Sequence, residues 1–172
     1  SHGMDLDVCA SAAQNVVFFN ELIGSQASAA DALFGDFISR VDASKALKRE
    51  GFYPAVAIHS PYSVHPILIK KALQIVKNEK LKLTAHFMES FAEREWLDKN
   101  EGDFRGFFEN LLKQNSSVTD SSEFLDHFNG HKTLLTHVVK ANKDELKQIS
   151  SNAHTIIHCP ISNRLLGNGV LD

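Results

Sequence analysis

The stretch "LKLTAH" (81–86) is a short, mainly apolar run that ends in a histidine, and the chain repeats this pattern. Each such run is rich in Val, Ile, Leu and Thr, and a polar turn and a helical pattern follow it. That alternation is typical of β/α units that build a parallel sheet. The expected strands are "NVVFFNE" (15–21), "PAVAIH" (54–59), "LKLTAH" (81–86), "TLLTH" (133–137) and "TIIH" (155–158). All but the first end in histidine.

Helical patterns fill the intervals between these strands. The expected helices lie within 27–50 and at 66–78, 90–99, 102–114, 121–128 and 142–150. Pro66 suits the first turn of its helix, because a backbone N–H at that position would have no partner within the helix. Asn142 and Glu145 have the spacing of a helix-capping pair. The fold class predicted is therefore α/β: a partial TIM (β/α)₈ barrel of about five parallel strands with flanking helices.

Composition excludes several classes of protein. The 172 residues are 43% hydrophobic and 23% charged, with a formal net charge of −3 and no cluster of Lys and Arg. Nucleic acid is therefore not an expected partner. No stretch approaches the roughly 20 apolar residues of a membrane helix, so no membrane partner is expected either. The only cysteines are Cys9 and Cys159, which are too few for a disulfide framework and favour a cytoplasmic location. Residues 1–3 are interpreted as an expression scar, which sets His2 aside and leaves one domain, 4–172.

Four histidines occupy strand ends and are expected to meet. In a parallel barrel, the carboxyl ends of the strands surround one mouth, where catalytic groups lie. A single histidine there is more often structural than catalytic. Four at four strand ends are not expected by chance, so we expect His59, His86, His137 and His158 to share a cavity.

Four motifs in this chain resemble one family. They are "IHSPYSVHP" (58–66), "AHFMES" (85–90), "LLTHVV" (134–139) and "IIHCPISNRLLGNG" (156–169). In order and spacing they are similar to the amidohydrolase superfamily, in its zinc-dependent aminohydrolase and chlorohydrolase branch. Within that branch the chain most resembles the deaminases of aminodeoxyfutalosine and S-adenosylhomocysteine. The resemblance covers nearly everything after residue 15.

The resemblance implies a role for six residues. By position they are Glu89 and His137 as catalytic groups, His86 as a metal ligand, and His59, His158 and Asn163 as substrate-binding residues. Glu89 matches a proton-shuttling carboxylate, and His137 matches a histidine that orients or polarises the water. Zinc is the implied metal, although iron or manganese suits similar sites.

The implied function is hydrolysis of a C–N bond in a small molecule. A purine, or a similar heterocycle bearing an amidine, would be deaminated by attack of metal-bound hydroxide. Hydrolytic dechlorination and cyclic amide hydrolysis remain alternatives, because the same water and acid could perform them. A non-catalytic barrel piece that self-associates is the alternative for this chain alone.

Two elements of the family pattern are absent from this sequence. There is no His-x-His pair, which the family's first strand supplies, and no eighth-strand aspartate after the last motif. A complete barrel takes about 250 residues, so the chain is interpreted as a fragment that covers strands three to seven of the barrel. Alone, it is expected to be inactive and to bind zinc poorly. Its two outer strands would expose unpaired edges, which predicts a homo-oligomer or a swapped assembly.

Overall fold

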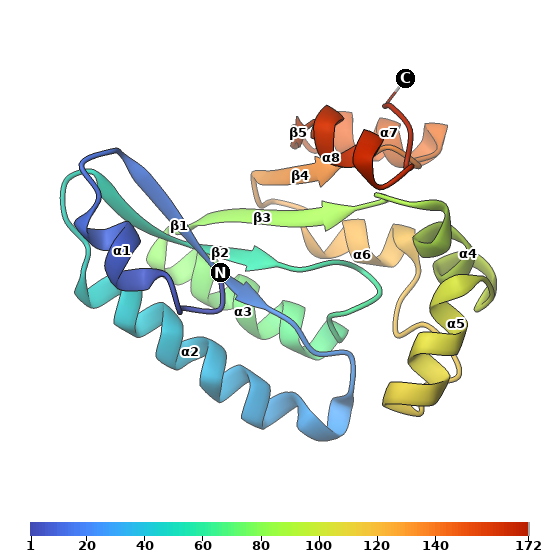
Figure 1. The fold of residues 1–172 in the computed structure, drawn as a ribbon, viewed down its shortest axis with the longest axis horizontal. Helices are drawn as coiled ribbons and strands as arrows, with labels where there is room; N and C mark the ends of the chain where they lie inside the picture. The colour runs from blue at the N-terminus through green and yellow to red at the C-terminus, as the bar shows by residue number, and fades with distance from the viewer. Residues whose placement is uncertain (172) are drawn as a thin grey trace.

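The computed structural model describes residues 1–171, and within them five strands form one parallel sheet. The strands are β1 (Val16–Leu22), β2 (Phe52–Ile58), β3 (Lys82–Phe87), β4 (Thr133–His137) and β5 (Thr155–Ile157). They lie in the sheet in their order along the chain, β1-β2-β3-β4-β5, and each neighbouring pair is parallel. Helical segments connect successive strands (Figure 1). This arrangement confirms the predicted α/β fold, a partial (β/α)₈ barrel.

The helices largely follow the predicted pattern. They are α1 (Leu6–Ser11), α2 (Ala30–Ala46), α3 (Pro66–Glu79), α4 (Phe91–Lys99), α5 (Asp103–Phe107), α6 (Ser121–His127), α7 (Lys143–Ser151) and α8 (Pro160–Leu165). The helix expected within 102–114 is divided, because α5 continues as a π-helical turn, Phe108–Leu112. The sequence did not indicate α1 and α8, each of only six residues, because so short a segment shows no repeated amphipathic pattern.

Four of the five strands begin or end one or two residues away from the expected positions, whereas β4 has the predicted bounds, 133–137. The strand predicted at 54–59 begins at Phe52 instead, because Phe52 and Tyr53 pair with Val16 and Val17 of β1. It ends at Ile58, which places His59 in the loop that follows the strand. Tertiary pairing, rather than local hydrophobicity, therefore decides where β2 begins.

Both predicted helix starts are confirmed. Pro66 is the first residue of α3, and the side chain of His65 accepts a hydrogen bond from the backbone N–H of Ile67. Asn142 and Glu145 form a capping box at the start of α7. Each device satisfies backbone N–H groups that have no partner within the helix.

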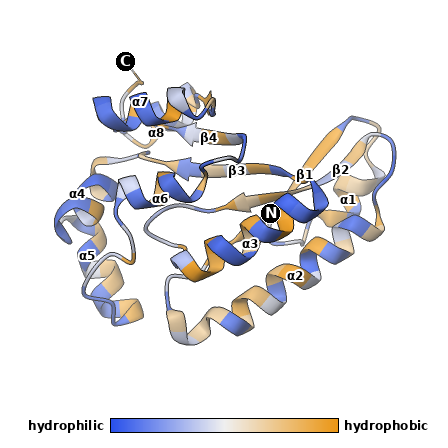
Figure 2. Ribbon diagram, turned by 180° about the vertical axis from the view of Figure 1, so that it is seen from behind, coloured by the Kyte–Doolittle hydropathy of each residue, from blue (hydrophilic) through white to orange (hydrophobic). Residues whose placement is uncertain are grey.

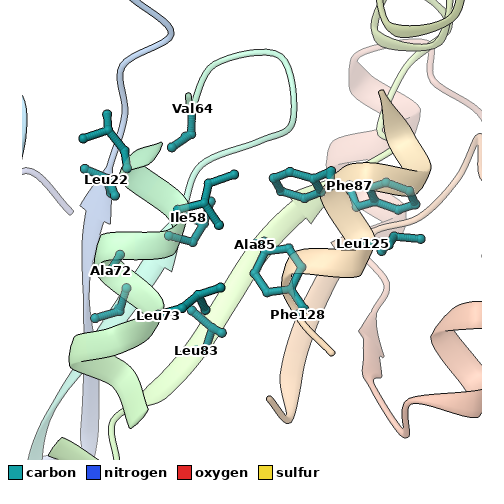
Figure 3. Close-up of a cluster of buried hydrophobic side chains, with 14 of the residues drawn as sticks. Leu22, Ile58, Val64, Ala72, Leu73, Leu83, Ala85, Phe87, Leu125 and Phe128 are labelled. Atoms are coloured by element: carbon teal, nitrogen blue, oxygen red, sulfur yellow. The ribbon is translucent and has the colours of Figure 1, made fainter. Parts of the chain in front are cut away.

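The hydrophobic core lies between the sheet and the helices that cover one of its faces. Ala72 and Leu73 of α3, together with Leu125 and Phe128 around α6, face the strands (Figure 3). Helices α2 and α3 each carry hydrophobic and hydrophilic residues in alternation along their length (Figure 2), as expected for helices with one buried side. None of the helices in the described part of the chain is long and apolar enough to span a membrane.

On β3, the face of the sheet opposite the core helices carries polar residues. On β3, Leu83, Ala85 and Phe87 are buried, whereas the alternate residues Thr84 and His86 remain partly exposed. Successive side chains of a strand point to opposite faces, so His86 lies on the face away from the core helices. In the complete barrel of a (β/α)₈ fold, that face is the interior.

Candidate active site

Three histidines from three successive β/α units meet at the carboxyl ends of the strands. His59 follows β2, His86 lies in β3 and His137 is the last residue of β4. The ring centroids of His59 and His86 are 5.4 Å apart, and those of His86 and His137 are 5.3 Å apart. The structure therefore brings together three of the four imidazoles that were predicted to share a cavity.

Glu21 adds a carboxylate to the histidine cluster. Its Oε1 lies 4.0 Å from Nε2 of His86, and one ligand atom from each of Glu21, His59 and His86 fits within 4.8 Å of the others. Glu21 was not among the predicted site residues, because the prediction considered only the histidines at the strand ends. The signal was present, since Glu21 ends the first expected strand just as histidines end the others.

The first residues of the chain contact β1 next to this cluster. The amino group of Ser1 donates to the carbonyl oxygen of Phe19 at 2.7 Å, and the N–H of Glu21 donates to the carbonyl oxygen of Ser1 at 3.0 Å. Nε2 of His2 lies 3.1 Å from a carboxylate oxygen of Glu21. His2 is one of the residues interpreted above as an expression scar, so this contact gives it no role in the proposed site.

Burial favours the neutral form of the His59 and His86 imidazoles. Burial lowers the pKa of His86 to about 4, and the neighbouring His59 and His137 add to this effect. Burial also lowers the pKa of His59, against the opposing influence of Glu21 and Glu89. A metal binds only unprotonated imidazole, so His86 is in the form that a metal requires at pH 7. Among residues 1–171, its buried Nδ1 has no hydrogen-bond partner.

His137 is fixed between an amide and a carboxylate. Its Nδ1 lies 3.0 Å from Oδ1 of Asn163, which is fully buried in α8. An amide oxygen can only accept, so Nδ1 carries the proton. The other nitrogen, Nε2, lies 3.5 Å from Oε1 of Glu89. The structure thus brings three of the predicted site residues, Glu89, His137 and Asn163, into one line of contacts.

The turns after β3 and β4 have unusual backbone conformations. Met88, His137 and Val138 have positive φ angles of 50°, 76° and 58°, a region that residues other than glycine rarely adopt. Two hydrogen bonds link the turns: the N–H of Val138 donates to the carbonyl oxygen of Phe87, and that of Lys140 donates to the carbonyl oxygen of Met88, both at 2.8 Å. Such strain persists only where the surrounding contacts enforce it, and it is common at functional sites.

His59 borders an apolar cavity. Its Nδ1 lies 2.8 Å from Oγ of Ser60 and 2.6 Å from Oγ of Ser63, which fixes the orientation of the ring. A cavity of about 380 Å³ opens beside it. The side chains that line it include Ile23, Tyr62, Phe107, Phe108 and Leu112. A neutral imidazole at the edge of an apolar cavity is suited to contact a heterocyclic ligand.

His158 stands apart from the other site residues, so the prediction that it shares a cavity with the other three histidines is wrong. It follows β5 directly and is exposed. Within residues 1–171, no hydrogen bond or ring contact joins it to the histidine cluster. By contrast Asn163, from the same motif, is buried and contacts His137.

One buried carboxylate next to the site was not identified from the sequence. Glu93, in α4, is only 1% exposed, and its two oxygens accept hydrogen bonds from the backbone N–H groups of Met88 and Glu89. Burial raises the pKa of Glu93 to about 7, although these hydrogen bonds act in the opposite direction. The available signal was its position three residues after Ser90, the helix cap.

With this geometry established, comparison with known proteins gives the family. Residues 6–172 match the model of the Amidohydrolase family, and the chain belongs to that family. It is 54% identical to the aminodeoxyfutalosine deaminase of a Nitratiruptor species, covering 100% of this chain and 42% of that protein. It is 30% identical to the adenosine deaminase of Helicobacter pylori, covering 100% of this chain and 43% of that protein.

A solved structure is similar to this chain in both fold and sequence. Helicobacter pylori aminofutalosine deaminase in complex with methylthio-coformycin superimposes with a TM-score of 0.92 at 31% identity, over 99% of this chain and 43% of that one. The chain therefore spans less than half the length of the relatives that it matches. The residues observed also fit the divalent metal that the family generally uses, because His86 is a neutral imidazole beside a second imidazole and a carboxylate.

Proposed function

We propose that the protein containing this chain is a metal-dependent hydrolase that deaminates a purine carried by a nucleoside. Aminodeoxyfutalosine is the first candidate substrate, because the 54% identical relative is a deaminase of that compound. The observation that carries the proposal is the meeting of His59, His86 and His137, with Glu89 against the last of them. Fold alone would not support an activity, but this set of side chains has the groups that hydrolysis of an amidine carbon requires.

His86 is the residue of this chain that would hold the metal. Its low pKa keeps the imidazole unprotonated at neutral pH, and zinc is the metal we propose, because imidazole nitrogen is among its common ligands. Catalytic zinc takes three or more protein ligands, so other parts of the protein would supply the remainder. When bound, zinc provides an acidified water, because it lowers the pKa of that water to about 7.

Glu89 would move the protons of the reaction. Hydrolysis adds water to the carbon that bears the amino group, and that carbon becomes a carbonyl as ammonia leaves. One proton must pass from the water to a ring nitrogen, and another must reach the departing amine. A carboxylate beside the reacting atoms can make both transfers.

His137 and His59 would orient the reactants. The bond from Nδ1 of His137 to Asn163 leaves Nε2 directed towards Glu89, where it can accept a proton or a hydrogen bond. His59 is held by Ser60 and Ser63 and is suited to contact the substrate ring. Nδ2 of Asn163 is buried and has no partner among residues 1–171, which supports a role for Asn163 in substrate binding.

The test is a substrate panel with the full-length protein and measurement of released ammonia. Aminodeoxyfutalosine and adenosine would be compared with a chlorinated heterocycle and a cyclic amide. We expect ammonia from the aminopurine substrates and a matching change in their ultraviolet spectrum. Turnover of the chlorinated compound or the cyclic amide, with no ammonia from any aminopurine, would overturn the proposal.

A further inference from the structure

Glu93 is a buried carboxylate that none of the roles above uses. It lies in the first turn of α4 and is 1% exposed. Burying a carboxylate is costly unless hydrogen bonds replace its water, so the contacts that it makes identify what it does. Its Oε1 accepts from the N–H of Met88 at 3.0 Å, and its Oε2 accepts from the N–H of Glu89 at 2.8 Å.

These bonds differ from those of an ordinary helix cap. In a capping box, the glutamate at the third helical position accepts from the N–H of the capping residue itself, as Glu145 does from Asn142 at 2.7 Å. In α4 the cap is Ser90, and its side chain accepts from the N–H of Glu93. The Glu93 carboxylate instead reaches the two residues before the cap. It therefore holds the turn that carries Glu89 and is not part of the helix cap.

This turn needs to be held because its conformation is strained. Met88 has a φ of 50°, which costs energy in a residue other than glycine. Two successive N–H groups that converge on one carboxylate fix the peptide planes on both sides of the Met88 α-carbon. The direction in which the Glu89 side chain leaves the backbone is fixed by the same contacts.

The next residue of α4 anchors the turn that follows His137. Nη2 of Arg94 donates to the carbonyl oxygen of Lys140 at 2.9 Å, and Nη1 donates to Oε1 of Glu145 at 2.9 Å. The first turn of α4 thus contacts the turn after β3 through Glu93 and the turn after β4 through Arg94. Glu89 and His137 are carried by these two turns, so their separation depends on this helix end.

We infer that Glu93 is a positioning residue that sets the Glu89 carboxylate against His137. The inference rests on the proposed function, because it concerns the same proton transfers. Glu93 does not touch the metal or the substrate in this assignment. It acts through two backbone N–H groups, and its removal should affect catalysis more than binding.

The experiment compares Glu93→Gln with Glu95→Gln in the full-length protein. Glutamine keeps the size of the side chain but presents one oxygen and one amide group, so one of the two backbone N–H groups loses its acceptor. Glu95 lies two residues further along α4, is exposed, and provides the matched control. We expect kcat of Glu93→Gln to fall by about 100-fold, the effect of a misplacement of about 1 Å. KM and metal content should stay close to those of Glu95→Gln.

A double-mutant cycle separates positioning from a general structural effect. If Glu93 acts through Glu89, then adding Glu93→Gln to Glu89→Gln should cause no further fall in kcat, because the two residues act as a unit. An equal fall in both backgrounds, or no fall in either, would overturn the inference. A fall in Tm accompanied by equal losses in kcat and metal content would also overturn it.

Hydrogen exchange keeps the test independent of the proposed activity. If the full-length protein deaminates nothing, the proposed function fails, but exchange at the amides of Met88 and Glu89 can still be measured. We expect faster exchange in a peptide spanning residues 87–93 of Glu93→Gln than in the same peptide of Glu95→Gln. Unchanged exchange would overturn the role of Glu93 on its own.

Discussion

Oε1 of Glu89 lies 3.5 Å from Nε2 of His137. The two residues come from different β/α units, and each is carried by a turn with positive φ angles, at Met88 before Glu89 and at His137 itself. A carboxylate and an imidazole this close can exchange a proton through a small movement or a bound ligand. The proposed catalysis depends on this pair and on the groups that hold it.

Glu89→Gln should abolish most deaminase activity of the full-length protein while leaving the metal bound. Glutamine cannot carry the transferred proton, and loss of general acid–base catalysis typically costs about 100- to 10,000-fold. Steady-state ammonia release and metal analysis would be measured together. The control is Glu101→Gln, an exposed site of the same residue type. Activity of Glu89→Gln equal to that of this control would remove Glu89 from the mechanism.

His86→Ala should lower the metal content of the protein. The variant removes an imidazole whose low pKa suits it to bind metal at neutral pH. Inductively coupled plasma emission spectroscopy after dialysis would give the metal content of each variant. His131→Ala is the matched control, because His131 precedes β4 and lies at the other end of the strand from His137. Full metal occupancy in His86→Ala would contradict the assignment.

Asn163→Ala should reduce turnover by about 10- to 100-fold, the usual effect of losing the partner that orients a catalytic or ligating histidine. Its buried oxygen accepts from Nδ1 of His137, so removal frees that ring to rotate. Turnover would be compared with that of Asn129→Ala, which lies in an exposed turn. Equal rates in the two variants would show that the amide does not orient His137.

The raised pKa of Glu93 predicts a pH-dependent stability. The ordinary pKa is 4.5, and burial raises it to about 7, with Glu89 adding to the rise and Arg94 opposing it. Between these values the folded state retains a proton that the unfolded state has released. Stability should therefore fall as pH rises from 4.5 to 7 and should level off above pH 7. The difference between these two pKa values corresponds to roughly 3 kcal/mol in the free energy of unfolding.

Urea denaturation of the full-length protein at about pH 5 and about pH 7.5, on either side of the raised pKa, would measure this dependence. The free energy of unfolding of the wild type minus that of Glu93→Gln should be smaller at the higher pH, because the variant lacks the titrating group. All other titrating groups cancel in the difference. A difference that is constant, or larger at the higher pH, would contradict the predicted direction.

The isolated chain should self-associate. In the order β1-β2-β3-β4-β5, β1 and β5 are the outer strands of the described sheet, and unpaired strand edges favour pairing with another chain. Sedimentation velocity over a range of concentrations would show species larger than the 19.1 kDa chain. A strictly monomeric chain at high concentration would refute this expectation.

Much of the fold could be predicted from local sequence. Parallel strands covered by helices consist of apolar runs, and helix starts such as Pro66 and Asn142 depend on nearby residues alone. Because the strands of a β/α fold run in one direction, polar residues at their ends had to lie at one rim. The sequence alone therefore predicted that His86 and His137 lie close together, as they do in the structure.

Contacts between distant segments could not be predicted in the same way. The bond between Asn163 and His137 joins α8 to β4, and the environment of Glu93 depends on the left-handed turn at Met88. Residue type and periodicity were enough to set the order of elements and the chemistry at each strand end. Which carboxylate is buried, and which imidazole is held neutral, followed from the packing of the folded chain. Desolvation and hydrogen-bond geometry arise only when groups distant in the chain pack against each other.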